Sequence, residues 1–230
     1  MRRLLPIVPT GDALASVDVD VVAAYRDLAR PRPAGRPWVV LSMVSSVDGA
    51  ITLGGVSGGL GGDGDRAVYR TLRSVADTVL VGASTVRAEH YQPPKKPGQI
   101  IAVVTASGDL DFTWPLFSGG HAIVVAPLDG PPVPVPTIRA GHGAVDLAAA
   151  VGQLPGDIVL AEGGPGLNGQ LLAAGLVDEL CVTIAPVSVA GRSSRLAHGD
   201  VEHLRALHLA QLLTDDSGAL YARYLTIDPG

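Results

Sequence analysis

Residues 158–172 read IVLAEGGPGLNGQLL: an apolar run ends in an acid, and glycines and then helix-forming residues come after it. Within this stretch, residues 164–169 satisfy G-x-G-x-x-G, the pattern of a dinucleotide-binding loop. Glycines between a strand and a helix let the backbone approach a ligand closely, and the helix N-terminus offers free N–H groups to an anion. The stretch therefore predicts a β–α turn that binds a diphosphate, with a glycine-rich turn that binds nothing as the alternative.

The residues after this turn exclude a Rossmann fold. The Rossmann fingerprint includes an acid about 20 residues on, at the end of the next strand, and normally opens the fold. Here the next apolar run ends VTIAPVSVAG at residues 182–191, without an acid, and the turn comes late in the chain. Phosphate binding remains as the prediction, whereas ribose recognition of the Rossmann type does not.

Composition narrows the class of protein. The 230 residues are 47% hydrophobic and 17% charged, which is ample for a buried core. The net charge is −5 and no basic run occurs, so nucleic-acid binding has no electrostatic support. The single Cys181 cannot form an internal disulfide and fits a reducing compartment. The apolar stretch at residues 4–8 is too short and is broken by Pro6, so we expect neither a signal peptide nor a membrane helix but a cytoplasmic protein.

Strand and helix patterns alternate along the chain and predict an α/β domain with a mostly parallel central sheet flanked by helices. Strands are expected at 38–46, 77–82, 99–105, 121–126, 157–162 and 178–186, and helices at 18–29, 63–75, 84–91, 144–153 and 165–175. Residues 132–138 are rich in proline and suit only an edge strand. The runs 206–214 and 219–227 flank the turn DDSG and predict an antiparallel C-terminal hairpin. We expect residues 1–37 to form a helix and linker that pack on a single domain, 38–230.

Charged and polar residues mark two helix starts. Asp63 or Asp65 is expected to cap the helix over 63–75, and Ser84 the helix over 84–91. Three arginines, at 66, 70 and 73, share one face of the first of these helices. They could bind phosphate, but a solvated face paired with the two aspartates is the favoured interpretation.

A second glycine-rich segment contains Gly-Val-Ser-Gly-Gly at residues 55–59, which fits the nucleophile pattern G-x-S-x-G. A serine hydrolase using Ser57 would need an acid such as Asp109, Asp111, Asp146 or Asp157 and then His198 as partners. Further glycines delay the following helix, which disfavours the strained turn that such a nucleophile requires. The histidine and cysteine spacings indicate no metal site.

Asp48 directly follows the expected buried strand 38–46. Ligands of open α/β sheets bind at the carboxyl ends of the strands, so Asp48 is a candidate ligand-binding or catalytic residue. An Asp-Gly turn is the alternative. Burial beside Met43, Val44 and Val47 would raise the pKa of its carboxyl group and suit it to donate a proton.

Four stretches in order resemble one known family: SSVDGAI, SGGLGGDGDR, LRSVADTVLVGASTVRAEHY and EGGPGLNGQLLAAGLVDELCVTIAP. They are similar to the reductase domain of the riboflavin-biosynthesis pyrimidine reductase family, which has a dihydrofolate reductase-like fold. The resemblance covers residues 38–225. It implies a homodimeric enzyme that uses NADPH to reduce the ribosyl group of a phosphorylated ribosylamino-pyrimidine to ribityl, by hydride transfer from nicotinamide C4 to the imine at sugar C1′.

The resemblance also assigns site residues. The NADPH contacts it implies are Gly82, Ala83, Ser84, Thr85, Thr105, Ser107, Glu162, Gly163, Gly164, Pro165, Gly166 and Leu167. The substrate contacts it implies are Ser46, Asp48, Ser57 and Gly58. Thr105 and Ser107 lie where the family meets the adenosine 2′-phosphate, but no Arg or Lys accompanies them in VVTASGDL.

The chain departs from the family where many members read T-V-x-x-D-[DN]-P, because residues 85–91 read TVRAEHY. Glu89 keeps the acid that the family uses in catalysis, and the proline is absent. Asp48 and Glu89 are therefore the candidate proton donors, expected after neighbouring strands, and we favour Asp48. A pterin such as dihydrofolate as substrate, and a nucleotide-binding protein without turnover, remain alternatives. The zinc deaminase motifs of bifunctional members are absent from the sequence.

Overall fold

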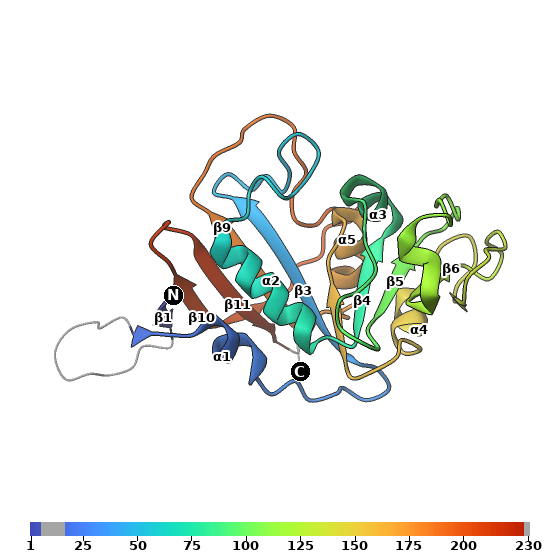
Figure 1. The fold of residues 1–230 in the computed structure, drawn as a ribbon, viewed down its shortest axis with the longest axis horizontal. Coiled ribbons are helices and arrows are strands. Elements are labelled where there is room, and N and C mark those ends of the chain that lie inside the picture. Colours follow the sequence, from blue (N-terminus) through green and yellow to red (C-terminus); the bar gives the residue numbers. More distant parts are fainter. Residues whose placement is uncertain (6–16, 228–230) are drawn as a thin grey trace.

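A computed structural model describes residues 1–5 and 17–227, and it places one mixed sheet at the centre of the molecule (Figure 1). The strands are β1 Arg2–Leu5, β2 Val17–Asp18, β3 Trp38–Ser46, β4 Thr78–Gly82, β5 Ile100–Val104, β6 Ala122–Ala126, β7 Thr137–Arg139, β8 Ile158–Ala161, β9 Glu179–Ala185, β10 Leu207–Thr214 and β11 Leu220–Thr226. The helices are α1 Val21–Arg26, α2 Asp63–Val75, α3 Ala83–Glu89, α4 Leu147–Val151, α5 Pro165–Ala173 and a 3₁₀ segment, η1 Pro115–Gly120. Residues 6–8 of the apolar stretch that was considered as a leader lie outside the described residues.

The strands are arranged in the order β2-β1-β10-β11-β9-β3-β8-β4-β5-β6-β7. Pairing is parallel from β9 through to β7, and β9, β11, β10, β1 and β2 pair antiparallel. The α/β class, the mostly parallel sheet and the C-terminal hairpin are therefore confirmed. The proline-rich segment supplies β7 at one edge, as expected, because prolines cannot donate to a second neighbour.

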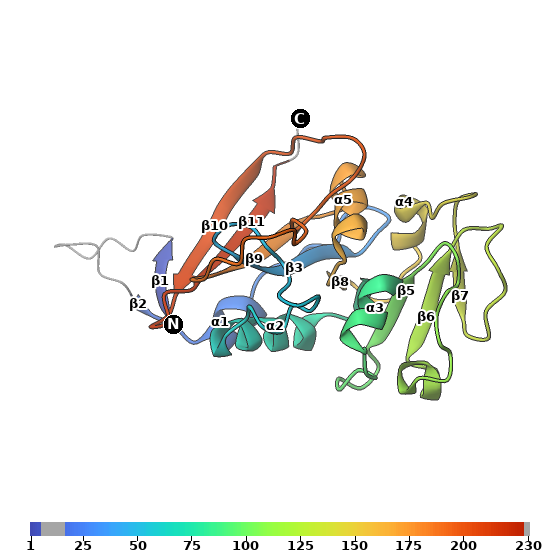
Figure 2. The ribbon, with the colours of Figure 1, turned by 90° about the horizontal axis from the view of Figure 1, so that it is seen from above.

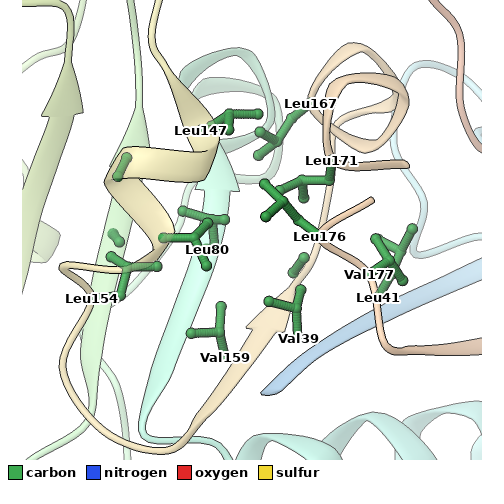
Figure 3. Close-up of a cluster of buried hydrophobic side chains, with 14 of the residues drawn as sticks. Val39, Leu41, Leu80, Leu147, Leu154, Val159, Leu167, Leu171, Leu176 and Val177 are labelled. Carbon is green, nitrogen blue, oxygen red and sulfur yellow. The ribbon is translucent and has the colours of Figure 1, made fainter. Parts of the chain in front are cut away.

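Helices cover both faces of the sheet (Figure 2): α1, α2 and α3 lie on one side, and α4 and α5 on the other. Successive side chains of β3 point to opposite faces of the sheet. Val39 and Leu41 pack against α4 and α5, and Val40 packs against α1 and α2. Figure 3 shows the core beneath α4 and α5, where the side chains of both helices meet those of β3, β4 and β8. Burial on both faces explains the continuous apolar runs of these strands.

Several local expectations were wrong. Helix α2 begins after Gly62 without a side-chain cap, so neither Asp63 nor Asp65 caps it. Helix α3 begins one residue earlier than expected, with Gly82 in the capping position and Ser84 inside the first turn. Residues 1–37 also contribute two strands that propensity did not reveal, because β1 is defined by its pairing with β10 at the far end of the chain. No helix within the described residues is both long and apolar enough to cross a membrane.

A buried ion cluster fastens the segment before β3 to the antiparallel strands. Glu179 of β9 is fully buried and accepts hydrogen bonds from Arg30, at 2.8 and 2.9 Å, and from Nε of Arg223, at 2.8 Å. The indole N–H of Trp38 donates to the same carboxylate at 3.2 Å. Burial would raise the pKa of Glu179, but the hydrogen bonds from the two arginines prevail and lower it. The carboxylate is thus ionised and fully partnered.

We predict that Glu179→Gln lowers the free energy of unfolding by about 3–5 kcal/mol, because it leaves two buried guanidinium groups without their counter-ion. Urea denaturation measures this, with the exposed Glu202→Gln as the control that should stay close to wild type. The pKa of Glu179 is depressed in the folded state, so its contribution is present above the unfolded value of about 4.3 and is lost as the pH falls below it. The gap between the variant and wild type should therefore narrow in acid, and equal stability at pH 7 would contradict the prediction.

Candidate functional site

The candidate residues gather at one edge of the sheet. The parallel strands β3, β8, β4 and β5 are adjacent in that order and end at the same edge. The residues at this edge are Ser46 at the end of β3, Gly163 after β8, Gly82 at the end of β4 and Thr105 after β5. The carboxyl edge of a parallel sheet is where α/β proteins bind ligands, so the topology brings the predicted contacts together.

Two glycine turns abut at the middle of this edge. The backbone N–H of Gly82 donates to the carbonyl oxygen of Gly163 at 2.7 Å. A Cβ atom on Gly82 would lie 3.4 Å from the nitrogen of Gly164, and Gly163 has φ +89°, a conformation that favours glycine. A Cβ atom on Gly164 would lie 2.8 Å from Oγ1 of Thr85. The backbone conformation of Gly163 thus favours glycine, and a side chain at Gly164 would displace the Thr85 hydroxyl group.

Helix α5 starts at this turn, with Gly164 in the capping position and Pro165 at its first position. No side chain caps the helix, so its first-turn amides at Gly166 and Leu167 have no partner within the helix. The side chain of Leu167 is buried in the core, so only its backbone can meet a ligand. The loop after β9 covers the flank of the helix, since His198 N–H donates to the Pro165 carbonyl at 3.1 Å.

The carboxylate of Glu162 is held by side chains of α2 and of the segment after α3. Arg73 of α2 forms a bidentate ion pair with it, both contacts at 2.7 Å, and the hydroxyl of Tyr91 donates to it at 2.5 Å. The rings of Tyr69 and Tyr91 lie against the Arg73 guanidinium, at 4.9 and 5.5 Å. Burial raises the pKa of Tyr91 well above its usual value, and the charge of Glu162 raises it further. Glu162 therefore braces the turn against α2, and its carboxylate oxygens already have hydrogen-bond donors within the chain.

The arginine face of α2 is divided among different partners. Arg66 pairs with Asp63 at 2.6 Å, as expected for a solvated face, whereas Arg73 reaches Glu162 instead of an aspartate. Burial raises the pKa of Asp65, and this residue makes no ion pair within the described part of the chain.

Asp48 is exposed and ionised, contrary to the expectation of a buried carboxyl group with a raised pKa. The hydroxyl of Ser46 donates to it at 2.5 Å, and the backbone amides of Val189 and Ala190 donate at 3.1 and 2.7 Å. These hydrogen bonds, that of Ser46 first and then those of the amides, hold the pKa of Asp48 far below its usual range. Asp48 therefore ties the end of β3 to the loop after β9 and is poorly suited to donate a proton.

Glu89, at the end of α3, contacts the other candidate loop. Its Oε1 accepts a hydrogen bond from the Ser57 amide at 2.8 Å. Ser57 and Gly58 lie in a loop that reaches α2 only at Asp63, so Ser57 does not occupy a strand–turn–helix nucleophile elbow. Asp48 and Glu89 do not follow neighbouring strands, because β8 lies between β3 and β4. That expectation was wrong because β8, which comes about eighty residues after β4 in sequence, lies between β3 and β4 in the sheet.

The loop after β5 holds the remaining candidates. Thr105 is buried and its hydroxyl oxygen accepts from the Gly108 amide at 3.0 Å, while that of Ser107 accepts from the Asp109 amide at 3.3 Å. Arg87 of α3 donates to the carbonyl oxygen of Asp109 at 2.5 Å. The sequence did not associate Arg87 with this loop, since it lies on a different element and no local pattern links the two. The described residues contain no cluster of three or more potential metal ligands.

This fold is that of the dihydrofolate reductases and their relatives. A dihydrofolate reductase from Enterococcus faecalis superposes with a TM-score of 0.52 at 14% identity, over 83% of this chain and 97% of that one. A pyrimidine reductase-like protein from Corynebacterium diphtheriae superposes with a TM-score of 0.79 at 25% identity, over 91% of this chain and all of that one.

Sequence comparison identifies the family. The model of the RibD C-terminal domain matches residues 37–221, and the chain belongs to that family. It is 30% identical over 179 residues to the 2,5-diamino-6-ribosylamino-4(3H)-pyrimidinone 5′-phosphate reductase of Methanothermobacter thermautotrophicus, which covers 70% of this chain and 82% of that protein.

We predict that Asp48→Ala accelerates hydrogen exchange at the amides of Val189 and Ala190 by about tenfold or more, because both lose a charged acceptor. Exchange followed by NMR measures this, with the exposed Asp200→Ala as the control. The pKa of Asp48 is depressed, so protection in the wild type should persist at about pH 3, below the ordinary value of about 3.9 for an aspartate. Loss of protection near pH 4 in the wild type would contradict the assignment.

Proposed function

We propose that this protein is an NADPH-dependent reductase of a phosphorylated ribosylamino-pyrimidine, converting the ribosyl group to ribityl. The observation that carries the proposal is the pair of abutting glycine turns at Gly82 and Gly163–Gly164, beside the uncapped start of α5. This arrangement lies on the same sheet edge as the loop after β9, which Asp48 holds, and the loop at Ser57, which Glu89 holds. Membership of the RibD C-terminal domain family and the activity named for the archaeal relative support it.

The residues of the central edge fit a dinucleotide. The amides of Gly166 and Leu167 face outward from the first turn of α5, where the helix dipole favours a diphosphate. Gly163 and Gly164 are buried where the two turns meet, whereas Gly166 is partly exposed and carries no side chain, so a ligand can approach its backbone closely. The adjoining Ser84 is exposed and Thr85 partly so, and their hydroxyl groups can donate to a phosphate.

The proposed reduction requires only one proton-donating group from the protein. A bound nicotinamide supplies a hydride to sugar C1′, where the ring-opened ribosylamine presents an imine carbon. The imine nitrogen or the former ring oxygen must then receive a proton, which one carboxyl group can deliver. We assign this role to Glu89 rather than Asp48. One oxygen of Glu89 has no hydrogen-bond donor among the described residues, whereas both oxygens of Asp48 accept bonds that keep it ionised.

The direct test of function is NADPH oxidation against a panel of substrates. The panel contains the phosphorylated ribosylamino-pyrimidine in its deaminated and non-deaminated forms, together with dihydrofolate. We expect substrate-dependent loss of absorbance at about 340 nm with a pyrimidine and none with dihydrofolate. Turnover of dihydrofolate alone would favour the pterin alternative, and NADPH binding without turnover would favour a binding protein.

For the cofactor site, we predict that Gly166→Asp weakens NADPH binding at least about tenfold while the protein stays folded. The new carboxylate would repel the diphosphate, yet an acid in the first turn of a helix favours the helix. A Cβ atom at this position meets only His198, at 3.6 Å, so the side chain fits. Gly166→Ala is the matched control without charge and should bind within about threefold of wild type. Equal NADPH affinity of Gly166→Asp and wild type would show that the diphosphate does not bind at this turn.

For the proton donor, we predict that Glu89→Gln lowers kcat by roughly 10²–10⁴, the usual effect of losing general-acid help. The amide can still accept the hydrogen bond from Ser57, so the loop stays in place. Asp48→Asn should chiefly raise KM, because it loosens the contact between the end of β3 and the loop after β9. Steady-state kinetics separate the two effects, and a larger fall of kcat in Asp48→Asn would reverse the assignment.

We also propose a homodimer. On the face of the sheet opposite α1 and α2, partly exposed apolar side chains line β9, β10 and β11: Val182, Ile184, Leu212, Leu220 and Tyr224. Among the described residues no helix lies over β10 and β11 on this side (Figure 2). Covering such a face removes apolar area from water. Light scattering should give twice the 23.5 kDa of one chain, and a monomer mass at micromolar concentration would refute the dimer.

A further inference from the structure

A hollow of about 190 Å³ lies on the α3 side of the sheet. The described residues that line it are His90, Tyr91, Gln92, Trp114 and Pro115. The first three follow α3 in sequence, and the last two lead into η1. Helix α3 begins at the carboxyl edge of the sheet and, over its seven residues, runs about 10 Å away from it. The hollow therefore lies outside the edge that carries the candidate cofactor contacts.

The walls of the hollow rest on one apolar core. Val86 of α3 and Leu116 and Phe117 of η1 are buried together against β4 and β5, so both elements lie on the same face of the sheet (Figure 2). Tyr91 and Trp114 are partly buried and pack against this cluster. The core thus fixes the two walls relative to each other, and a ligand would meet a preformed site with a small ordering cost.

The lining favours a flat, uncharged ligand. The ring centroids of His90 and Trp114 lie 5.7 Å apart with the planes tilted by 52°, so the two rings do not stack face to face and a planar ligand can lie against either. Gln92 donates through Nε2 to the carbonyl oxygen of His90 at 2.9 Å, and its amide oxygen can accept from a ring N–H. No residue among the five that line the hollow is an acid, a lysine or an arginine. The volume is below the about 300–1,000 Å³ of sites for drug-sized molecules, so it suits one or two fused rings.

Tyr91 connects the hollow to the glycine turn. Its side chain lines the hollow, and its hydroxyl group donates to the Glu162 carboxylate at 2.5 Å. Glu162 directly precedes Gly163, whose carbonyl oxygen accepts the hydrogen bond from Gly82. The other contacts of this carboxylate come from Arg73, at 2.7 Å. A ligand that displaces the Tyr91 ring therefore changes one of the hydrogen bonds that brace the turn.

We propose that this hollow binds a planar nitrogen heterocycle of one or two rings, as found in nucleobases and indoles, and that its occupation changes the contact between Tyr91 and Glu162. Stacking on aromatic side chains accepts many such rings, because each presents a π face. A hollow lined mainly by rings is a poor site for ordered water, which needs about two to four polar partners. The site does not depend on which substrate the protein reduces, because it lies outside the carboxyl edge.

The test titrates caffeine, a purine, and indole into isotopically labelled protein, followed by NMR, with cyclohexanol as a saturated control. We expect a Kd of about 1 mM or tighter for at least one of the two heterocycles, with the largest shifts at the Gln92 amide and the Trp114 indole N–H. Only indole carries a ring N–H, so tighter binding of indole would report a bond to Gln92 and tighter binding of caffeine would report stacking alone. Cyclohexanol should leave these signals in place.

Variants of the lining locate the site. Trp114→Leu should weaken binding at least about fivefold, and His90→Ala, at an exposed position, should also weaken it. Phe112→Leu is the matched control, because it removes a ring from the same loop that packs on Phe117 outside the hollow. Its affinity should stay within about twofold of wild type.

Tyr91→Phe separates the site from its effect on the turn. The variant keeps the ring that lines the hollow and removes the hydroxyl group that donates to Glu162. In wild type, the bound ring should also shift the amides of Gly163 and Gly164. In Tyr91→Phe, the heterocycle should bind within about twofold of wild type, and the shifts at these two glycines should disappear.

Four results would overturn the proposal. Neither heterocycle binds up to about 10 mM. The shifts centre on Thr105 and Gly166, which would place the ring at the carboxyl edge instead. Trp114→Leu and His90→Ala both bind as tightly as wild type. The shifts at the glycine turn are absent in wild type or persist in Tyr91→Phe.

Discussion

The hydrogen bond between Gly82 and Gly163 is the contact on which the candidate site depends. It joins two β–α turns that are far apart in sequence, and it is possible because β4 and β8 pair in parallel and end together. Gly163 has a positive φ and a Cβ atom on Gly164 would crowd the Thr85 hydroxyl group, so glycine suits the close backbone contact at this edge. Strands β3 and β5 flank these two strands and bring other candidate groups to the same edge. The brace formed by Arg73 and Glu162 secures it from one face of the sheet, and α5 secures it from the other.

Local sequence patterns were sufficient to predict most helices and strands and the edge of the sheet at which the candidate site lies. The apolar run WVVLSMVSS became β3 with the expected bounds, and the glycine-rich turn became the start of α5, because hydrophobic period and backbone freedom act within a few residues. Strand order was beyond such reasoning. The placement of β8 between β3 and β4 depends on which faces each strand must cover, and no local signal reports that.

The surroundings of individual side chains could not be predicted for the same reason. Asp48 comes after a buried strand, as expected, but its environment is set by amides 141 and 142 residues away that fill its lone pairs and keep it charged. Glu162 stands in the family motif, yet Arg73 of the distant helix α2 donates to both of its carboxylate oxygens. No local pattern predicted the contact between Arg87 and Asp109, because a loop and strand β5 separate these residues in sequence. The pKa and the partners of a side chain depend on the residues that surround it in the folded protein, and these are often far away in sequence.

The position of β3 also constrains how the chain is made. β3 is synthesised early, yet its partners β8 and β9 start 120 and 139 residues after the positions they pair with, Trp38 and Val40. On a ribosome, this apolar strand would emerge long before either neighbour exists, and the sheet can close only when most of the chain has been translated. Such distant pairing carries a large loop-closure entropy and slows folding. Throughout that interval the strand would be a natural ligand for a chaperone.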